Sequence, residues 1–351
     1  MNSGLSDEDG SKALNQKRGC VMKAAWYERN GSAREVLQVG ELEKPKVEPG
    51  KVLVRMHATG VNPSDTKRRA RLPLLQGVKQ QIPHQDGAGV IEEVGDGVST
   101  SRLRQRVWIY EALVAGKAGC AAEYVVVPSE NAIELPKNMP FETGACLGVP
   151  ALTAHRCVFA DGPVTGKTVL VTGGAGSVGV HAIQFAKAAG ARVFTTISRP
   201  EQAVVARDAG ADLVIHRHEE DVVSRIQEAT HTVGAPAVDR IIDVAFGETL
   251  PFAVKLLKVG GVIATYSSDT QPEPTIPFLP LLFLDATIRF MNVYMMSREA
   301  HEGAIEAATV GLREGWLRPT IASRFSLDQI VAAHEATESC KSVGKVVVLF
   351  D

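Results

Sequence analysis

The sequence predicts an α/β protein in which a doubly wound parallel sheet is combined with a second, mainly antiparallel β domain. Three observations lead to this prediction. The chain has 351 residues, which is longer than one ordinary domain of roughly 100–200 residues. Short strand-like runs fill its first part, and strand-like and helix-like runs alternate from Thr168 onward. We therefore expect two domains that differ in the direction of their strands.

The composition is that of a globular protein without a strong net charge. Hydrophobic residues make up 45% of the chain, charged residues 22%, and the formal net charge is −2, so nucleic-acid binding is not expected. No apolar run approaches the roughly 18 residues of a membrane span. Five scattered cysteines without Cys-x-x-Cys spacing favour a reduced, cytoplasmic protein. Residues 1–21 are polar and lack the apolar core of a signal peptide, which predicts a flexible extension.

Short strands are expected from the end of this extension to Val127. They are predicted by alternating or continuous apolar residues between turns. The alternation within Lys51–Gly60 gives His57 an outer position on a strand rather than a catalytic role. A polar loop at Asn62 then leads into a short basic helix. The expected strands are Met22–Tyr27, Leu37–Glu41, Lys51–Gly60, Ile82–Gly95, Arg106–Tyr110 and Ala121–Val127.

Helix and strand patterns alternate in the second part of the chain. A helix is predicted over Thr143–Ala160, followed by nearly continuous apolar strands, which are typical of a parallel sheet covered on both faces. An amphipathic helix is expected over Arg298–Glu314, and Ser326–Gln329 is a capping box that opens another. Gly344–Phe350 is a closing strand that we expect to return to the first domain. The other expected strands begin at Thr168, Arg192, Ala211, Val238 and Gly260.

The strand that begins at Thr168 runs into a glycine-rich turn and then a helix. Gly174, Gly176 and Gly179 match the pattern G-x-G-x-x-G. We expect Gly174 to permit the tight turn, Gly176 to let a pyrophosphate approach the backbone, and Gly179 to let helix and strand pack closely. The helix N-terminus would stabilise the anion through its N–H groups and its dipole. The pattern, in this context, predicts a dinucleotide site.

Several motifs give the chain a resemblance to a known family. They are Ala58–Asp65, Gln85–Val90, Gly144–His155, the Gly174 turn and the final Gly-Lys-Val-Val-Val. From about Met22 to Asp351 the chain resembles the medium-chain dehydrogenase/reductase superfamily. Its Asn62-Pro63-Ser64-Asp65-Thr66 segment is similar to the N-P-x-D-T motif of the zinc-independent quinone oxidoreductases, the ζ-crystallin-like group.

The resemblance implies a domain order and an assembly. A Rossmann domain, residues 150–287, would be inserted in a GroES-like, mainly antiparallel β domain formed by residues 22–149 and 288–351. A homodimer through the edge of the Rossmann sheet is also implied. The apolar segment Ile276–Phe283 would either line the substrate cleft or form the dimer contact, and the sequence leaves both roles open.

Zinc-dependent members of the superfamily bind their catalytic metal through Cys, His and Cys. The matching positions here hold Asn62, Gln85 and, less securely, Val149. None of the three supplies a thiolate or an imidazole, so no catalytic zinc is expected. Cys146 lies close to the third position, and we interpret it as a small buried apolar residue.

The cofactor is predicted from the end of the second parallel strand. An NAD site places an acidic residue there to accept from the ribose 2′-hydroxyl, but this chain has Ser198 followed by Arg199. A guanidinium favours a 2′-phosphate, so NADPH is expected. Arg217 matches a second phosphate-contacting position of the family, and a solvated surface role fits it equally. The full set of expected cofactor contacts is Asn62, Thr153, Gly174, Gly176, Ser177, Val178, Gly179, Ser198, Arg199, Arg217, Val244 and Tyr266.

Hydride transfer without a metal favours conjugated acceptors, because quinones and α,β-unsaturated carbonyls delocalise the incoming charge. The candidate catalytic residues are Asn62, Asp65 and Tyr110. Asn62 would donate to the developing oxyanion, orient the nicotinamide ribose, or only cap its loop. Asp65 would move protons or tie the following turn, and Tyr110 would donate to a carbonyl or pack within its strand. Thr153 resembles a family residue that faces the nicotinamide, and its alternative is a hydroxyl bonded to its own helix.

Two positions depart from the family pattern. Lys67 stands where many relatives have tyrosine, which puts the family's substrate pocket in doubt. Arg104-Gln105 replaces Gly-Asp and is expected to alter only a turn. The expected function is a zinc-independent, NADPH-dependent reductase of quinones or enones. The alternatives are an enoyl-thioester reductase and an NADPH-binding protein that acts structurally or binds RNA, although the mild acidity argues against RNA.

Overall fold

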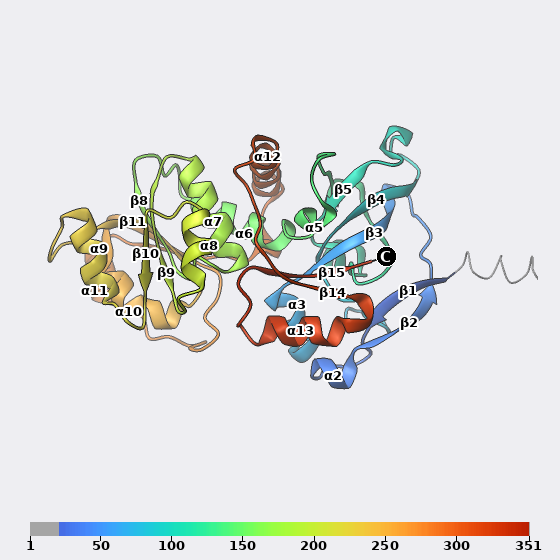
Figure 1. Ribbon diagram of the computed structural model, residues 1–351, viewed down its shortest axis with the longest axis horizontal. Helices are drawn as coiled ribbons and strands as arrows, with labels where there is room; N and C mark the ends of the chain where they lie inside the picture. Colours follow the sequence, from blue (N-terminus) through green and yellow to red (C-terminus); the bar gives the residue numbers. More distant parts are fainter. Residues whose placement is uncertain (1–20, 351) are drawn as a thin grey trace, which may run out of the picture. The chain divides into compact units, whose positions relative to one another are not determined.

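The computed structural model describes residues 21–350 as two compact units (Figure 1). The first unit holds the described residues up to Ala145, together with Arg324–Cys340 and those from Val346 onward, and the second holds Cys146–Ser323 and Lys341–Lys345. Of the extension predicted for residues 1–21, only Val21 lies among the described residues, and it begins the first strand.

The first unit is built on a mainly antiparallel sheet. Its central strand is β3 (Lys51–Val61), which pairs antiparallel with three others. Within the described chain the other strands are β4 (Asp86–Val94), β5 (Arg106–Ile109), β6 (Tyr124–Pro128), β7 (Ala132–Glu134), β14 (Ile321–Ser326) and β15 (Lys345–Leu349). The order is β14-β15-β3-β4-β5-β7, with β6 also paired to β3. The last strand therefore returns to the first strands of the chain, as predicted.

Apolar residues of β3 form the centre of this unit's core. Val52, Val54 and Met56 are buried in one cluster with residues of β4, β5 and β6, which is the face that the sequence alternation predicted. His57 stacks on the ring of Phe141 with centroids 4.2 Å apart. His57 is half-buried on β3, in agreement with its predicted position on a strand.

A smaller layer of elements packs on this unit. It contains the antiparallel pair β1 (Val21–Trp26) and β2 (Gln38–Glu43), with α2 (Ala33–Val36) and α13 (Ile330–Glu338), and its apolar side chains share one buried cluster. The short basic helix α3 (Pro63–Arg71) contacts α13. Two shorter helices, α4 (Ala112–Gly116) and α5 (Phe141–Gly144), also belong to this unit.

The second unit contains a parallel sheet of the Rossmann type. Its strands within the described chain are β8 (Thr168–Val171), β9 (Arg192–Ile197), β10 (Leu213–His216), β11 (Val238–Asp243), β12 (Leu257–Thr265) and β13 (Thr287–Phe290). The order is β10-β9-β8-β11-β12-β13. Because β8 lies between β9 and β11, the strand order reverses there, and the C-terminal ends of β8 and β11 mark the place where such sheets bind ligands.

Helices cover both faces of this parallel sheet. Figure 1 shows α7 (Ser177–Ala188) and α8 (Gln202–Asp208) on one face, with α9 (Val222–Thr230) and α10 (Phe246–Leu256) on the other. The strand residues between them are buried, among them Leu170, Phe194 and Ile241. Nearly continuous apolar strands are what a sheet covered on both faces requires. The predicted α/β fold with a GroES-like antiparallel sheet and a Rossmann sheet is therefore confirmed.

Two sequence expectations about element boundaries differ from the structure. Residues 288–323 were assigned to the GroES-like domain, but β13 joins the parallel sheet and α12 (Arg298–Glu314) packs on α6 (Gly148–Phe159), so this segment lies in the second unit. The single helix expected over Thr143–Ala160 is divided into α5 and α6. This division puts Pro150 in the first turn of α6, where its missing N–H is tolerated.

No helix within residues 21–350 is both long enough and apolar enough to cross a membrane.

Candidate functional site

The glycine-rich turn joins β8 to α7 at the switch point of the parallel sheet. Gly173 has a φ of +66°, a left-handed conformation that glycine adopts without a steric penalty. The N–H of Gly176 donates to the Gly173 carbonyl at 3.0 Å and closes the turn. The sequence analysis assigned this conformational role to Gly174, but the positive φ lies one residue earlier.

Gly174 and Gly179 are required by close packing. A Cβ on Gly174 would lie 2.0 Å from the Thr195 hydroxyl oxygen, and a Cβ on Gly179 would lie 2.3 Å from the Gly173 carbonyl oxygen. Gly179 therefore packs against the turn itself. Gly176 is different, because a Cβ there would meet only the Gly173 oxygen at 3.4 Å.

The exposed side of this turn fits a dinucleotide phosphate. Gly176 is exposed and is the N-cap residue of α7. Ser177 and Val178, in the first turn of α7, are half-buried. Free N–H groups at the start of a helix attract an anion. The glycine turn and the first helical turn of α7 therefore provide a surface that suits a pyrophosphate. Larger residues at positions 174 and 179 would distort this surface.

Val244 and Tyr266 follow the C-terminal ends of β11 and β12. The side chain of Val244 lies against Gly173, where a Cβ would come within 3.0 Å of Val244 Cγ1. The Tyr266 N–H donates to the Asp243 carbonyl at 3.1 Å. Both predicted cofactor residues thus lie at the carboxyl edge of the sheet, which is the edge where the glycine turn lies.

The loop after β9 presents the predicted phosphate-binding residues. Gln202 Oε1 accepts from the backbone N–H groups of Ser198 (2.8 Å) and Arg199 (3.1 Å), which fixes the loop. The Arg199 guanidinium donates to Glu201 through Nε (2.6 Å) and to the Lys341 carbonyl through Nη2 (2.7 Å). The half-buried Arg199 is therefore held in place by neighbours on both sides.

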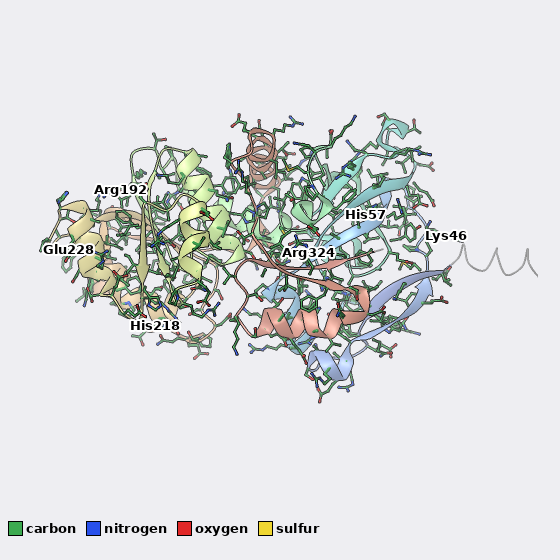
Figure 2. All side chains as sticks on the ribbon, in the orientation of Figure 1. Lys46, His57, Arg192, His218, Glu228 and Arg324 are labelled. Carbon is green, nitrogen blue, oxygen red and sulfur yellow. The ribbon has the colours of Figure 1, made fainter. Side chains whose placement is uncertain are left out.

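Arg217 follows β10, the strand next to β9, so both arginines lie at the same edge of the sheet. Its Nη1 donates to Glu248 at 2.9 Å. Arg217, His218 and Glu248 line a hollow of about 300 Å³, and His218 is labelled in Figure 2. Arg217 and Arg199 are therefore alike in that each guanidinium already has a carboxylate neighbour, Glu248 for Arg217 and Glu201 for Arg199.

Segment 341–345 near the chain end belongs to this unit, which sequence reasoning missed. The Gly344 N–H donates to the Ala175 carbonyl of the glycine turn at 3.2 Å, and the Lys341 carbonyl accepts from Arg199. Lys345 is buried, and its charge adds to the effect of burial, which is the main cause of the lowered pKa of His181 on α7. The signal in the sequence was the Gly-Lys pair before the last strand, which was interpreted only as a strand start.

The predicted catalytic residues Asn62 and Asp65 come together in the first unit. They form a capping box at the start of α3, and Asp65 Oδ2 accepts from the Asn62 N–H at 2.8 Å. The Asn62 amide Nδ2 donates to Asp86 Oδ2 at 2.8 Å. All three side chains are buried. The structure therefore shows the capping role of Asn62 and the turn-stabilising role of Asp65 that the sequence analysis had left as alternatives.

Tyr110 and Thr153 are two further predicted site residues, and they belong to different units. Tyr110 is buried just after β5, where its carbonyl accepts from Asn131 Nδ2 at 3.2 Å, and its ring lies 6.0 Å from that of Trp108. These contacts are those of a packed strand aromatic. Thr153 is buried within α6 in the second unit.

The side chains at the family's metal positions are amides and an apolar residue. Gln85 is buried, and its Oε1 accepts from the Val114 N–H at 3.4 Å. The Asn62 amide is occupied with Asp86 as described, and Val149 has no donor atom in its side chain. Amide groups are poor ligands for zinc compared with thiolate and imidazole. A search of residues 21–350 finds no group of three or more His, Cys, Asp or Glu residues placed to hold a metal ion.

Comparison with known proteins gives matches along most of the chain. Residues 48–137 match the alcohol dehydrogenase GroES-like domain, and residues 177–309 match the domain described as zinc-binding dehydrogenase. The quinone oxidoreductase of Lama guanicoe is 31% identical over 329 residues, which cover 90% of this chain and 94% of the relative. The human quinone oxidoreductase is 30% identical with the same coverage.

Solved structures with the same fold include a mycobacterial protein in complex with NADPH. That structure matches with a TM-score of 0.80 and 27% identity, covering 94% of this chain and all of the other. A quinone oxidoreductase of Pseudomonas syringae matches with a TM-score of 0.81 and 26% identity over the same shares of the two chains.

Proposed function

The chain belongs to the medium-chain dehydrogenase/reductase superfamily and is an oxidoreductase of the quinone oxidoreductase type, and from that premise we propose that it is a zinc-independent, NADPH-dependent reductase of quinones or α,β-unsaturated carbonyls. The observation that carries the proposal is the carboxyl edge of the Rossmann sheet. There the exposed Gly176 and the first turn of α7 suit a pyrophosphate, and Ser198 stands where an NAD site would have an acid, with Arg199 directly after it. The bound NADPH would supply the hydride.

The proposed cofactor residues fall into three groups by what they would do. Gly174, Gly176, Ser177, Val178 and Gly179 would receive the pyrophosphate. Ser198 and Arg199, with Arg217 in a secondary role, would receive the 2′-phosphate ribose. Asn62, Thr153, Val244 and Tyr266 are proposed on the family resemblance for the remaining cofactor contacts.

In the catalytic part of the site we propose that Asn62 and Asp65 act by holding the loop after β3. The supporting observation is that their capping box and the Asn62–Asp86 contact are buried hydrogen bonds. Tyr110 is the candidate hydrogen-bond donor to a carbonyl.

Cytoplasmic location is part of the proposal and is supported by the scattered cysteines.

One assay separates this function from its alternatives. The purified chain is mixed with NADPH and, separately, with a set of quinones, enones and enoyl-CoA thioesters, and oxidation of NADPH is followed. We expect turnover with quinones or small enones. Preferential turnover of enoyl-CoA would replace the proposal with an enoyl-thioester reductase, and binding of NADPH without turnover would indicate a structural role. Stoichiometric zinc in the active preparation would contradict the zinc-free mechanism.

Removing the Arg199 guanidinium is expected to reduce the preference for NADPH. A charge-assisted hydrogen bond contributes about 1.5–3 kcal/mol, so Arg199→Ala should weaken NADPH binding about 10- to 100-fold and leave NADH binding within about threefold. The measurement is fluorescence titration of both cofactors. Arg192→Ala is the matched control, because Arg192 begins the same strand at its opposite end (Figure 2). Equal loss of NADPH affinity in both variants, or unchanged discrimination in Arg199→Ala, would refute the cofactor assignment.

We propose a homodimer through the edge of the parallel sheet. β13 is the last strand in the order, and its pairing within the described residues is with β12. Phe290 on β13 and Phe283 on α11 (Phe278–Phe283) are 69% and 79% exposed. An edge strand can pair with its own copy about a two-fold axis, which would also cover these rings.

The dimer is tested by replacing an exposed ring at this edge. Phe290→Lys is expected to shift the chain from dimer to monomer in light scattering, because an isologous contact would bury the charge twice. Val204→Lys on α8 is the control, since Val204 is 60% exposed on a different element. A wild-type chain that is monomeric at tens of micromolar would show that the edge is not an interface.

A further inference from the structure

A buried carboxylate lies beneath the glycine turn. Asp243 is the last residue of β11 and is 1% exposed. Its Oδ1 accepts from the Thr172 hydroxyl at 2.8 Å and from the Ala245 N–H at 3.1 Å. Its Oδ2 accepts from the Thr249 hydroxyl at 2.5 Å. One carboxylate thus joins the end of β8 to the loop after β11 and to α10.

Thr172 is the residue that connects this carboxylate to the turn. It follows β8 and directly precedes Gly173, the glycine with positive φ. Besides donating to Asp243, its hydroxyl oxygen accepts from the Val244 N–H at 2.9 Å. Its own N–H donates to the Ile242 carbonyl at 2.9 Å. The entry to the glycine turn is therefore tied to the end of β11 by three hydrogen bonds.

Val244 adds a steric contact to these hydrogen bonds. Its Cγ1 lies in the space that a Cβ on Gly173 would need. A displacement of the loop after β11 would therefore push on Gly173, and a displacement of Thr172 would release the Val244 N–H into a buried site. Because the two loops carry one network, the position of one fixes the position of the other.

We propose that Asp243 is a positioning residue for the cofactor, whose carboxylate holds Thr172 and the loop after β11 together and so keeps the glycine turn in its phosphate-binding form. The inference rests on the proposed binding of a nicotinamide dinucleotide. A preformed turn binds more tightly, since no ordering cost is paid on association. Asp243 itself is covered by the network and would not touch the cofactor.

The arrangement distinguishes positioning from general stabilisation. Thr172 and Thr249 each donate one hydroxyl hydrogen bond to the same carboxylate, but only Thr172 borders the glycine turn, whereas Thr249 lies in α10. A carboxylate with only a structural role would make both hydroxyls matter equally. A positioning role makes cofactor binding sensitive to the Thr172 side alone.

The test compares Thr172→Val with Thr249→Val in the full chain. Valine keeps the shape of threonine and removes its hydroxyl. Dissociation constants for NADPH are measured by fluorescence titration, and melting temperatures are measured on the same samples. Both variants are expected to melt at lower temperature, but Thr172→Val should bind NADPH at least tenfold more weakly, while Thr249→Val stays within about twofold of the wild type.

A second pair of variants protects the test against misfolding. Asp243→Asn keeps one acceptor oxygen and should retain NADPH affinity within about threefold, whereas Asp243→Ala removes every acceptor and should lose at least tenfold. Unchanged affinity in Thr172→Val, or equal losses in both threonine variants, would overturn the inference while leaving the proposed function intact. A wild-type chain that binds neither NADPH nor NADH would overturn the proposed function and this inference together.

Discussion

Replacing Gly179 by alanine is expected to abolish useful NADPH binding, with a dissociation constant at least 100-fold higher than that of the wild type. The added Cβ would lie 2.3 Å from the Gly173 carbonyl oxygen and 2.9 Å from the Gly174 Cα. Both atoms belong to the backbone of the turn, so no side chain can rotate away to make room. The turn must shift from α7, and the N–H groups that would receive the pyrophosphate shift with it.

A matched control exists on another helix. Gly303 lies within α12, and a Cβ there would meet no atom within 4 Å. Gly303→Ala is therefore expected to stabilise the chain by roughly 0.5–1 kcal/mol through helix propensity and to leave NADPH binding unchanged. Fluorescence titration and thermal unfolding of the two variants measure both effects. NADPH binding by Gly179→Ala within tenfold of the wild type would mean that the phosphates do not use this turn.

The parts of the site that sequence reasoning predicted are those with a local cause. The glycine turn was predicted because strand, glycines and helix follow one another within a short segment. The proposed preference for NADPH likewise rests on two adjacent residues, Ser198 and Arg199, and stays a prediction. The alternation of β3 predicted its buried face. Each of these features depends on neighbours in the chain, so one sequence is sufficient to recognise it.

The parts that it missed depend on contacts between distant segments. Asp243 is absent from the residues that the sequence singles out, because its partners Thr172 and Thr249 lie in other elements. Likewise Gly344 reaches the glycine turn only after the chain has returned from α13. The assignment of residues 288–323 to the first domain was wrong for the same reason, since β13 is identified by its pairing with β12.

The choice between Gly173 and Gly174 shows a different limit. The motif G-x-G-x-x-G fits Gly174, Gly176 and Gly179, but two consecutive glycines leave the position of the left-handed residue open. The structure puts the positive φ at Gly173 and the steric requirement at Gly174. Pattern matching identifies the turn, and only backbone geometry divides the roles within it.

Acidification is expected to destabilise both units between about pH 6.5 and pH 4, because each contains a buried neutral histidine. Burial lowers the pKa of His334 in the first unit to about 3. In the second unit burial lowers the pKa of His181 to about 4, the hydrogen bond to the Ser177 carbonyl opposes this shift, and the charge of Lys345 adds to it. Both side chains are at most 1% exposed.

The sign follows from proton binding. In the unfolded chain a histidine has a pKa of about 6.5, so below that pH the unfolded state binds protons that the folded state does not, and the free energy of unfolding falls as the pH falls. The loss begins near pH 6.5 and continues to the folded pKa values, about 4 for His181 and 3 for His334. By pH 5 each histidine should have cost on the order of 2 kcal/mol.

Local contacts explain why these histidines stay neutral in the folded state. His181 Nδ1 donates to the Ser177 carbonyl at 2.7 Å, and Nε2 has no hydrogen-bond partner in the described structure, so a proton there would be buried without an acceptor. His334 Nε2 lies 3.0 Å from His84 Nε2, and the nearby Arg69 further lowers the pKa of His334. Asp243 acts in the opposite direction, because burial raises its pKa and its protonation on acidification favours the folded state.

Urea unfolding at pH 7.5 and pH 5.0 measures this contribution directly. The wild-type chain should lose several kcal/mol of unfolding free energy between the two pH values, and His181→Gln should lose about 2 kcal/mol less, even if it is less stable at pH 7.5. His218→Gln, which changes an exposed histidine, should show the same pH dependence as the wild type. If His181→Gln had the same pH dependence as the wild type, the His181 imidazole would be protonated in the folded chain. The buried, unpaired position of its Nε2 would then be incorrect.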